Sequence, residues 1–198
     1  VLPDAPRPGY TGIVNLGAEG MMLVAAVVGY AAAVHSGSDL VAFIAGAVAG
    51  ALLATVFGAL VIWLNTNQYA TGLALSLFGV GFSAFIGQPY TRERLSERAQ
   101  FEIPLLSDIP FIGPALFKQH PMVWVAIALT ILLMWWLNKS RSGLVLRALG
   151  QSPASAHALG CPVRWIRLGA VVAGGALCGV AGAYLSTVYT PLWVEGMV

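Results

Sequence analysis

Four polar side chains interrupt or border long apolar runs in this sequence, and they are the first candidates for chemistry. Asn15 and Glu19 lie in the run GIVNLGAEGMML at 12–23, and Asn67 and Gln68 directly precede the run YATGLAL. A carboxylate inside a membrane is costly and marks a functional site by default, and interrupted helices commonly line substrate routes. These four residues are therefore candidates for a substrate pathway. In the opposing interpretation Glu19 lies at the membrane surface and stabilises a helix N-terminus, while Asn67 and Gln68 simply cap a helix, which we favour for that pair.

Catalytic and metal-binding patterns are absent from the sequence. It contains no Ser-His-Asp set, no paired carboxylates and no Gly-x-x-x-x-Gly-Lys-Ser/Thr loop that would hold nucleotide phosphates. His35, His120 and His157 are isolated from one another, and Cys161 and Cys178 have no metal-ligand or redox spacing. We therefore expect no enzymatic activity, no metal, no cofactor and no nucleic-acid partner.

The elements that position these residues follow from the composition. Hydrophobic residues make up 58% of the chain and charged residues only 9%, with a mean hydropathy of +0.81. Soluble domains carry about 25% charged residues. Because so few charges cannot cover a water-exposed surface, the composition predicts an integral membrane protein.

Five apolar stretches approach the roughly 20 residues that a helix needs to cross the hydrocarbon of a bilayer. We predict an all-α, polytopic helical bundle that forms a single, incomplete transmembrane domain over residues 1–198. The first span reaches full length only with residues 12–19, which brings Asn15 and Glu19 near or into the membrane. The predicted spans are 12–34, 41–64, 69–87, 122–137 and 168–189.

Small residues predict how these spans pack. Lipid provides no hydrophobic drive for helices to associate, so small residues that let backbones approach provide the contact. The chain has 23 glycines, and two pairs have small-xxx-small spacing, Gly46 with Gly50 and Gly175 with Gly179. We interpret these pairs first as packing within the chain and second as contacts between subunits.

The basic residues predict the orientation. Segment 138–167 holds half of the ten Lys and Arg residues and no Asp or Glu, so the positive-inside rule makes it cytoplasmic. Segment 88–121 carries four basic and four acidic residues, and one span separates it from the basic segment. It is therefore expected outside, where its prolines interrupt helices and favour a compact hairpin against the membrane surface.

A short helix is predicted within the basic segment. Ser152 can cap a helix whose first turn begins with Pro153, and Gly160 can end it. One interpretation is an interfacial helix that only connects two spans. The other is a docking element for a soluble partner, because a small, smooth and rigid helix suits insertion into a cleft.

Several stretches of the chain resemble the permeases of branched-chain-type ABC importers, in the simple-sugar and nucleoside branch. The stretch Ser155–Gly160 fits the spacing of the coupling helix in that family. The chain departs from the family in carrying Gln151 and Ser152 where Glu and Asn are usual, which bears on the identity of the matching ATPase. The resemblance extends over nearly the whole chain from Gly12, in RALGQSPASAHALGCPV, GALCGVAGAYLS, GIVNLGAEGMML, NQYATGLAL and IPLLSDIPFIGPALF.

This resemblance implies a permease subunit of a bacterial ABC importer, located in the cytoplasmic (inner) membrane, that moves a nucleoside or a simple sugar. Besides membrane lipid it implies three partners: a cytoplasmic ABC ATPase, a second permease subunit (identical or homologous) and an extracytoplasmic substrate-binding protein. ATP hydrolysis would belong to the ATPase. The implied ATPase-docking residues are Arg147, Gly150, Ser152, Pro153, Ala156 and Gly160.

The alternative function is a secondary transporter or channel that works alone. Its spans should carry paired ionisable groups for ion coupling, and only Glu19 qualifies. The chain opens without Met and lacks the later spans of the family, so we expect a fragment that holds about half of a complete permease.

Overall fold

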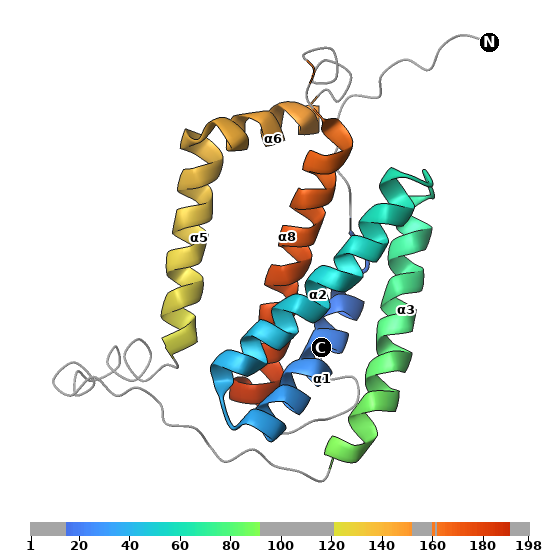
Figure 1. Ribbon diagram of the computed structural model, residues 1–198, viewed down its shortest axis with the longest axis vertical. Coiled ribbons are helices and arrows are strands. Elements are labelled where there is room, and N and C mark those ends of the chain that lie inside the picture. Colours follow the sequence, from blue (N-terminus) through green and yellow to red (C-terminus); the bar gives the residue numbers. More distant parts are fainter. Residues whose placement is uncertain (1–14, 92–120, 152–159, 161, 191–198) are drawn as a thin grey trace, which may run out of the picture.

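The computed structural model describes residues 15–91, 121–151, 160 and 162–190, and within these ranges the secondary structure is helical, with no strand (Figure 1). The 3-10 turn η1 (Gln88–Tyr90) extends one of the long helices, and the π-helix η2 (Leu185–Tyr189) extends another. The predicted all-α polytopic bundle is confirmed. Five helices are long and apolar enough to cross a membrane: α1 (Ala18–Ser36), α2 (Asp39–Ile62), α3 (Gln68–Gly87), α5 (Pro121–Lys139) and α8 (Val163–Tyr184).

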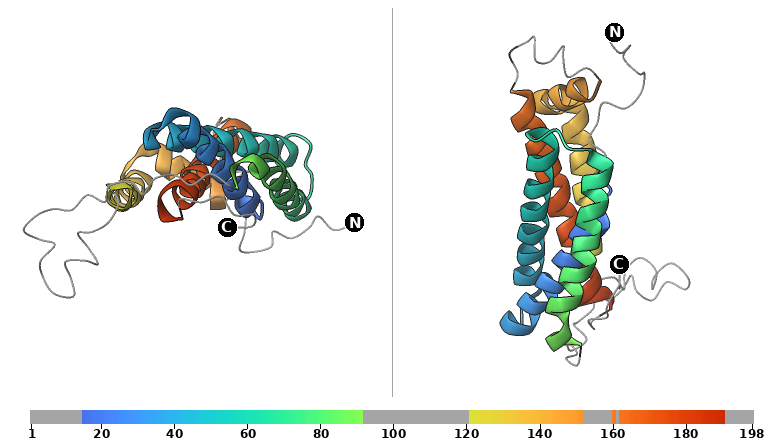
Figure 2. Two further views of the ribbon diagram at one scale, coloured as in Figure 1. Left: turned by 90° about the horizontal axis from the view of Figure 1, so that it is seen from below. Right: turned by 90° about the vertical axis from the view of Figure 1, so that its right-hand side faces the viewer.

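The core of the bundle is α1, which α2, α3 and α8 contact (Figures 1 and 2). Met21 and Tyr30 of α1 are fully buried, and Met21 packs against Phe57 and Ala54 of α2. A helix that is apolar on all sides is expected in such a central position. The sequence of α1 fits this rule, because its only ionisable residues are Glu19 in the first turn and His35 in the last turn, apart from the buried Tyr30.

The two small-residue pairs meet each other between α2 and α8. A Cβ atom placed on Gly50 would collide with the carbonyl oxygen of Gly175, and one placed on Gly179 would collide with that of Gly46. The backbones therefore touch, which only glycine allows at these positions. Internal packing, the first interpretation of the two pairs, is confirmed.

Helix α5 stands apart from this core. None of its residues is buried, and among the described residues its main contacts are with α6 (Arg141–Gln151). Figure 2 places α5 at one edge of the molecule and α3 at the other. Helix α6 lies across the end of the bundle and joins α5 to the side of α8 (Figure 1). α5 and α8 are thus neighbours in sequence, but α6 holds them apart.

The predicted ranges differ from the structure mainly at two places. The first helix begins at Ala18, because residues 15–17 form a turn rather than a helical start. The segment predicted as a loop at 138–167 contains α6 and the first turn of α8. The outer hairpin lies outside the described residues, except for 88–91 and Pro121, as does the predicted short helix over 152–159.

Candidate functional site at the start of α1 and the basic end

The start of α1 is built by Asn15. The backbone N–H of Gly17 donates to Oδ1 of Asn15 at 3.0 Å, and Nδ2 of Asn15 donates to Sδ of Met21 at 3.5 Å. Both groups of the side-chain amide are therefore used to shape the turn that precedes the helix. Because short amide side chains form such turns with the backbone two residues on, Asn15 explains why the helix begins at Ala18 and not earlier.

The start of α1 packs against the side of α3, at a position within the membrane-spanning length of α3. Ser76 Oγ donates to the carbonyl oxygen of Leu16 at 2.8 Å. A Cβ atom on Gly20 would lie 2.5 Å from the carbonyl oxygen of Leu75, so the two backbones touch here as well. At a rise of about 1.5 Å per residue, Leu75 and Ser76 lie about 10 to 12 Å along α3 from its start at Gln68. Helix α1 therefore begins about a third of the way along its neighbour.

Glu19 lies in the first turn of α1, at this depth. Its side chain is exposed, and among the described residues no hydrogen bond or ion pair engages its carboxylate. The N-terminus of a helix carries a partial positive charge that favours a nearby carboxylate. The partial charge of the helix N-terminus therefore favours the negative charge of Glu19 at this position within the span. The oxygens of Glu19 remain able to accept further hydrogen bonds.

Asn67 caps α3. Its Oδ1 accepts hydrogen bonds from the backbone N–H groups of Tyr69 at 3.0 Å and Ala70 at 3.4 Å. This is the usual arrangement at a helix N-terminus, and it agrees with the capping interpretation of the sequence. Asn67 and the half-buried Gln68 lie one turn before Gly72, which contacts Leu16 and Gly17. The fold therefore brings all four pathway candidates to one junction of α1 and α3, where Asn67 caps α3 and Asn15 forms the turn before α1.

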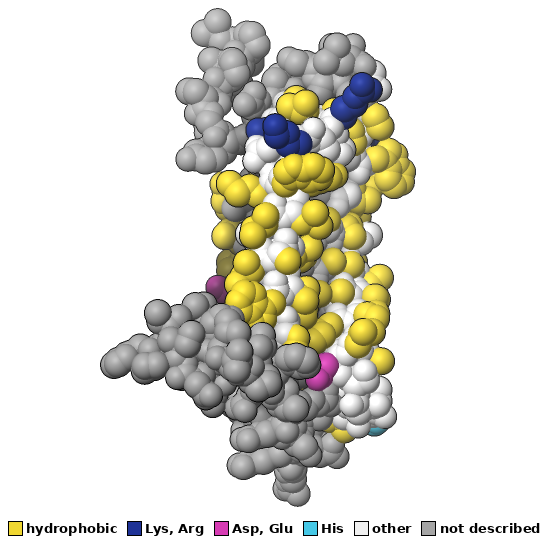
Figure 3. Space-filling model, turned by 90° about the vertical axis from the view of Figure 1, so that its left-hand side faces the viewer, with side chains coloured by type: hydrophobic (Ala, Val, Ile, Leu, Met, Phe, Trp, Pro, Cys, Tyr) yellow, Lys and Arg dark blue, Asp and Glu magenta, His cyan; other side chains and the backbone are white. Residues whose placement is uncertain are grey.

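All Lys and Arg residues of the described chain gather at one end of the bundle, which we call the basic end (Figure 3). Of the predicted docking residues, Arg147 and Gly150 lie on α6, and both are exposed. Gly160 has φ of +78°, a left-handed conformation that favours glycine. Ser152, Pro153 and Ala156 lie outside the described residues. The basic end consists of Lys139, Arg141, Arg147, Arg164 and Arg167.

Hydrogen bonds at the corner between α5 and α6 hold part of the basic end in place. Arg147 donates through Nη2 to the carbonyl oxygen of Asn138 at 3.4 Å, near the end of α5. Ser140 Oγ accepts from the backbone N–H of Gly143 at 3.0 Å, which caps the start of α6. A Cβ atom on Gly143 would lie 2.5 Å from the carbonyl oxygen of Leu137, so α6 lies directly against α5.

Comparison with known proteins gives the family. The profile of the family described as branched-chain amino acid transport system / permease component matches residues 8–197. The chain belongs to this family. The predicted resemblance to branched-chain-type permeases is therefore confirmed.

Curated relatives of this family member are permeases of ABC transporters. It is 35% identical over 190 residues to a putative glucose ABC transporter permease protein of Haloferax volcanii, covering 94% of this chain and 58% of the relative. It is 33% identical over 183 residues to a nucleoside ABC transporter permease protein of Lactococcus lactis, covering 87% and 58%. A guanosine ABC transporter permease protein of Bacillus subtilis is 29% identical over 191 residues, covering 90% and 60%. No solved structure matches. The chain spans little more than half the length of these relatives.

Sequence reasoning missed two features of this family member. Helix α6 carries a usable signal, because Ser140 is a capping residue and Val145, Leu146 and Leu149 recur at helical spacing. The contact between Trp63 and Trp165 carries none, since it joins the end of α2 to the start of α8 with ring centroids 5.4 Å apart. Their meeting depends on the packing of two spans that are distant in sequence.

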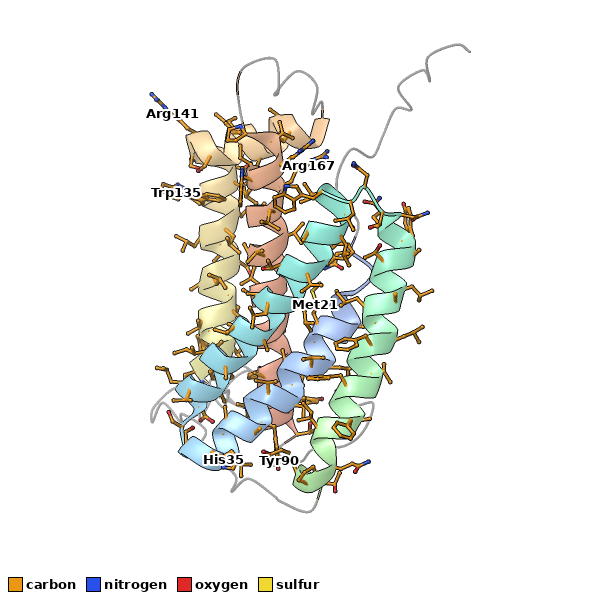
Figure 4. All side chains as sticks on the ribbon, turned by 45° about the vertical axis from the view of Figure 1, so that its right-hand side comes forward. Met21, His35, Tyr90, Trp135, Arg141 and Arg167 are labelled. Carbon is orange, nitrogen blue, oxygen red and sulfur yellow. The ribbon has the colours of Figure 1, made fainter. Side chains whose placement is uncertain are left out.

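At the opposite end of the bundle, ring side chains of α1 contact Tyr90 of η1. His35 Nε2 and the hydroxyl of Tyr90 lie 3.2 Å apart, and the ring of Tyr90 also meets that of Tyr30 edge to face (Figure 4). These contacts join the end of α1 to η1. No group of three or more His, Cys, Asp or Glu side chains that could hold a metal occurs among the described residues.

Proposed function

We propose that this chain is the membrane-spanning part of a permease subunit in a bacterial ABC importer that carries a nucleoside or a simple sugar across the cytoplasmic membrane. The observation that carries the proposal is the family match over residues 8–197, together with relatives named as permeases for glucose, nucleosides and guanosine. In this proposal the basic end faces the cytoplasm, as the positive-inside rule requires.

The proposed motor contact is the stretch 152–160, held by a separate cytoplasmic ATPase. This stretch lies between α6 and α8 in the chain, so a displacement there acts directly on the first turn of α8. Helix α8 in turn touches the backbone of α2 at Gly50 and that of α1 at Met22, which a Cβ on Gly182 would meet. Tightly packed interfaces shift between discrete arrangements and do not deform continuously. Because α8 is packed in this way against both α1 and α2, we expect these three helices to move together as one body.

The proposed substrate route passes the start of α1. Glu19 there offers carboxylate oxygens, which accept hydrogen bonds from the hydroxyl groups of a sugar or ribose. Asn15 uses its amide to form the turn before α1, and Asn67 uses its oxygen to cap α3. We therefore assign Glu19 the direct contact and the other candidates, Gln68 included, a place along the route.

A secondary transporter or channel is the rival proposal. Ion coupling calls for paired ionisable groups within the spans. In the described ranges the only carboxylates are Glu19 and Asp39, which lie in the first turns of α1 and α2. Helices α1 and α2 run in opposite directions (Figure 1), so these two first turns face opposite ends of the bundle. This arrangement favours the importer, which takes its energy from ATP. A second permease subunit and a substrate-binding protein at the outer face complete the proposed system.

Substitution of Ala156 by Trp tests the docking role in the complete importer. We expect substrate-stimulated ATPase activity and uptake of radiolabelled nucleosides and pentoses to fall at least about tenfold, since a lost contact of 1.4 kcal/mol already changes an equilibrium tenfold. Ala126→Trp on the exposed surface of α5 is the matched control, and it should leave both activities near their normal levels. Normal uptake and ATPase copurification in A156W would show that the stretch 152–160 is not the docking element.

Glu19→Gln tests the substrate contact separately. Loss of a hydrogen bond to a charged group costs about 1.5 to 3 kcal/mol, so we expect the KM for uptake to rise about 10- to 100-fold while the ATPase stays bound. If Glu19 only balances the helix dipole, the variant should instead lose about 0.3 to 1 kcal/mol of stability with KM unchanged. The second result would remove Glu19 from the proposed route.

A further inference from the structure

The first two turns of α6 and the end of α5 form an exposed cationic surface. Lys139, Arg141 and Arg147 are all exposed, and α5, which ends at Lys139, lies at one edge of the molecule (Figure 2). Figure 4 shows Arg141 extending away from the bundle at the corner of α5 and α6. Between the two arginines lies Leu144, which is 56% exposed.

No acidic side chain offsets these cations within the described part of the chain. Its only carboxylates are Glu19, in the first turn of α1, and Asp39, in the first turn of α2. Segment 138–167 contains no Asp or Glu at all. The surface therefore favours an anionic partner.

The depth of this surface is the level of lipid headgroups. Trp135 lies one turn before Lys139 on α5 and is 61% exposed, and Trp165 at the start of α8 is 66% exposed. Exposed tryptophans gather where the hydrocarbon meets the headgroups. Helix α6 lies across the spans at this level with cations on either side of an exposed leucine, which is the pattern of a helix in the membrane interface.

The corner also holds its cations in place. The bonds from Gly143 to Ser140 and from Arg147 to Asn138, with the close approach of Gly143 to Leu137, fix α6 against α5. Lys139 and Arg141 are therefore presented from a rigid turn. They lie at the opposite end of α6 from the stretch 152–160, about 15 Å away along a helix with a rise of 1.5 Å per residue. For Lys139 and Arg141 this separation favours a lipid partner over the ATPase, while Arg147, one of the predicted docking residues, lies nearer to that stretch.

We propose that Lys139, Arg141 and Arg147 form a binding surface for the phosphate headgroups of anionic phospholipids at the corner of α5 and α6. Leu144 inserts between the acyl chains beside the bound headgroup. The surface holds α5, whose main contacts within the described part of the chain are with α6, at a defined depth and angle in the bilayer.

Tryptophan fluorescence of the intact permease, reconstituted in phosphatidylcholine vesicles, tests this proposal. Brominated phosphatidylglycerol should quench the fluorescence more strongly than brominated phosphatidylcholine, and the preference should weaken at high salt. The triple variant K139Q/R141Q/R147Q should lose the preference, with each neutralised cation lowering the relative binding constant about fivefold. K139R/R141K/R147K is the matched control and should keep it.

Two results would overturn the proposal. The first is an equal quenching by the two brominated lipids, or a preference that survives in the triple Gln variant. The second is a triple Gln variant that loses copurification with the ATPase while its quenching by the two brominated lipids stays as in the unmodified permease, which would assign the surface to that protein. Thermal unfolding of each variant in detergent shows that a change in quenching is not a loss of fold.

Discussion

Helices α8 and α5 are both apolar enough to cross a membrane, yet α8 packs against α1 and α2 and α5 has no buried residue. They have the same mean hydropathy of 1.8 in their most apolar windows. They differ in small residues, because α8 carries five glycines and α5 carries none. Hydropathy therefore accounts for the presence of both helices in the membrane, but it does not account for their packing. In lipid, contact between helices depends on the close approach of backbones.

The sharpest test of this comparison lies within α8 itself. Gly175 faces α2, where an added Cβ would meet Ala54 and the carbonyl oxygen of Gly50, while an added Cβ on its neighbour Gly174 would meet open space. We expect Gly175→Ala to lower the free energy of unfolding by about 3 kcal/mol, the upper end for overpacked sites. Gly174→Ala should leave it unchanged or raise it by up to about 1 kcal/mol, because alanine favours the helix.

Reversible unfolding in mixed detergent micelles measures both variants. Equal losses from the two alanines would mean that the two faces of α8 do not differ in packing, and the comparison with α5 would fail.

A smaller effect is expected from a cavity. Phe57 of α2 is fully buried against Met21, whereas Ile131 of α5 is 64% exposed. Removing the Phe57 ring leaves a void of roughly 100 Å³, and the cavity term alone costs about 2 kcal/mol at about 24 cal/mol per Å³. The transfer term of a water-soluble core is left out, because lipid provides no hydrophobic drive for helices to pack. We expect Phe57→Ala to lower the free energy of unfolding by that amount and Ile131→Ala to change it by less than about 0.5 kcal/mol. A comparable loss from Ile131→Ala in the same micelles would show that the Ile131 side chain is packed within this chain.

The smallest effect concerns hydroxyl groups. Ser186 is buried and donates to the carbonyl oxygen of Ala26 in α1 at 2.8 Å, and Thr130 of α5 donates to Ala126 of its own helix at the same distance. Hydrogen bonds between membrane helices contribute about 0.6 kcal/mol on average and at most about 1.7 kcal/mol. We expect Ser186→Ala to lose about 1 kcal/mol and Thr130→Ala to lose almost nothing. If the two losses are the same, Ser186 does not link η2, the extension of α8, to α1 through this bond.

Much of the candidate site could be predicted from local sequence. Asn67 precedes an apolar run, and it caps α3 because an amide oxygen beside free backbone N–H groups has few better partners. Gly160 follows a predicted helix and has the positive φ that a glycine at a helix end often adopts. Asn15 illustrates the limit, since its spacing from Gly17 predicts a turn only when the start of α1 is known.

The sequence by itself determined the class of the protein and the identity of its spans, because hydropathy acts over one helix length and needs no partner. It also determined which residues allow backbones to touch, as in Gly46, Gly50, Gly175 and Gly179. Only the tertiary structure decided that these two pairs meet each other, and that Ser76 fastens the start of α1 inside the span. It alone placed Glu19 at that depth and left α5 outside the core. The physical reason is that packing joins residues far apart in the chain, and helices of equal hydropathy have no preference for one partner until their surfaces are fitted together.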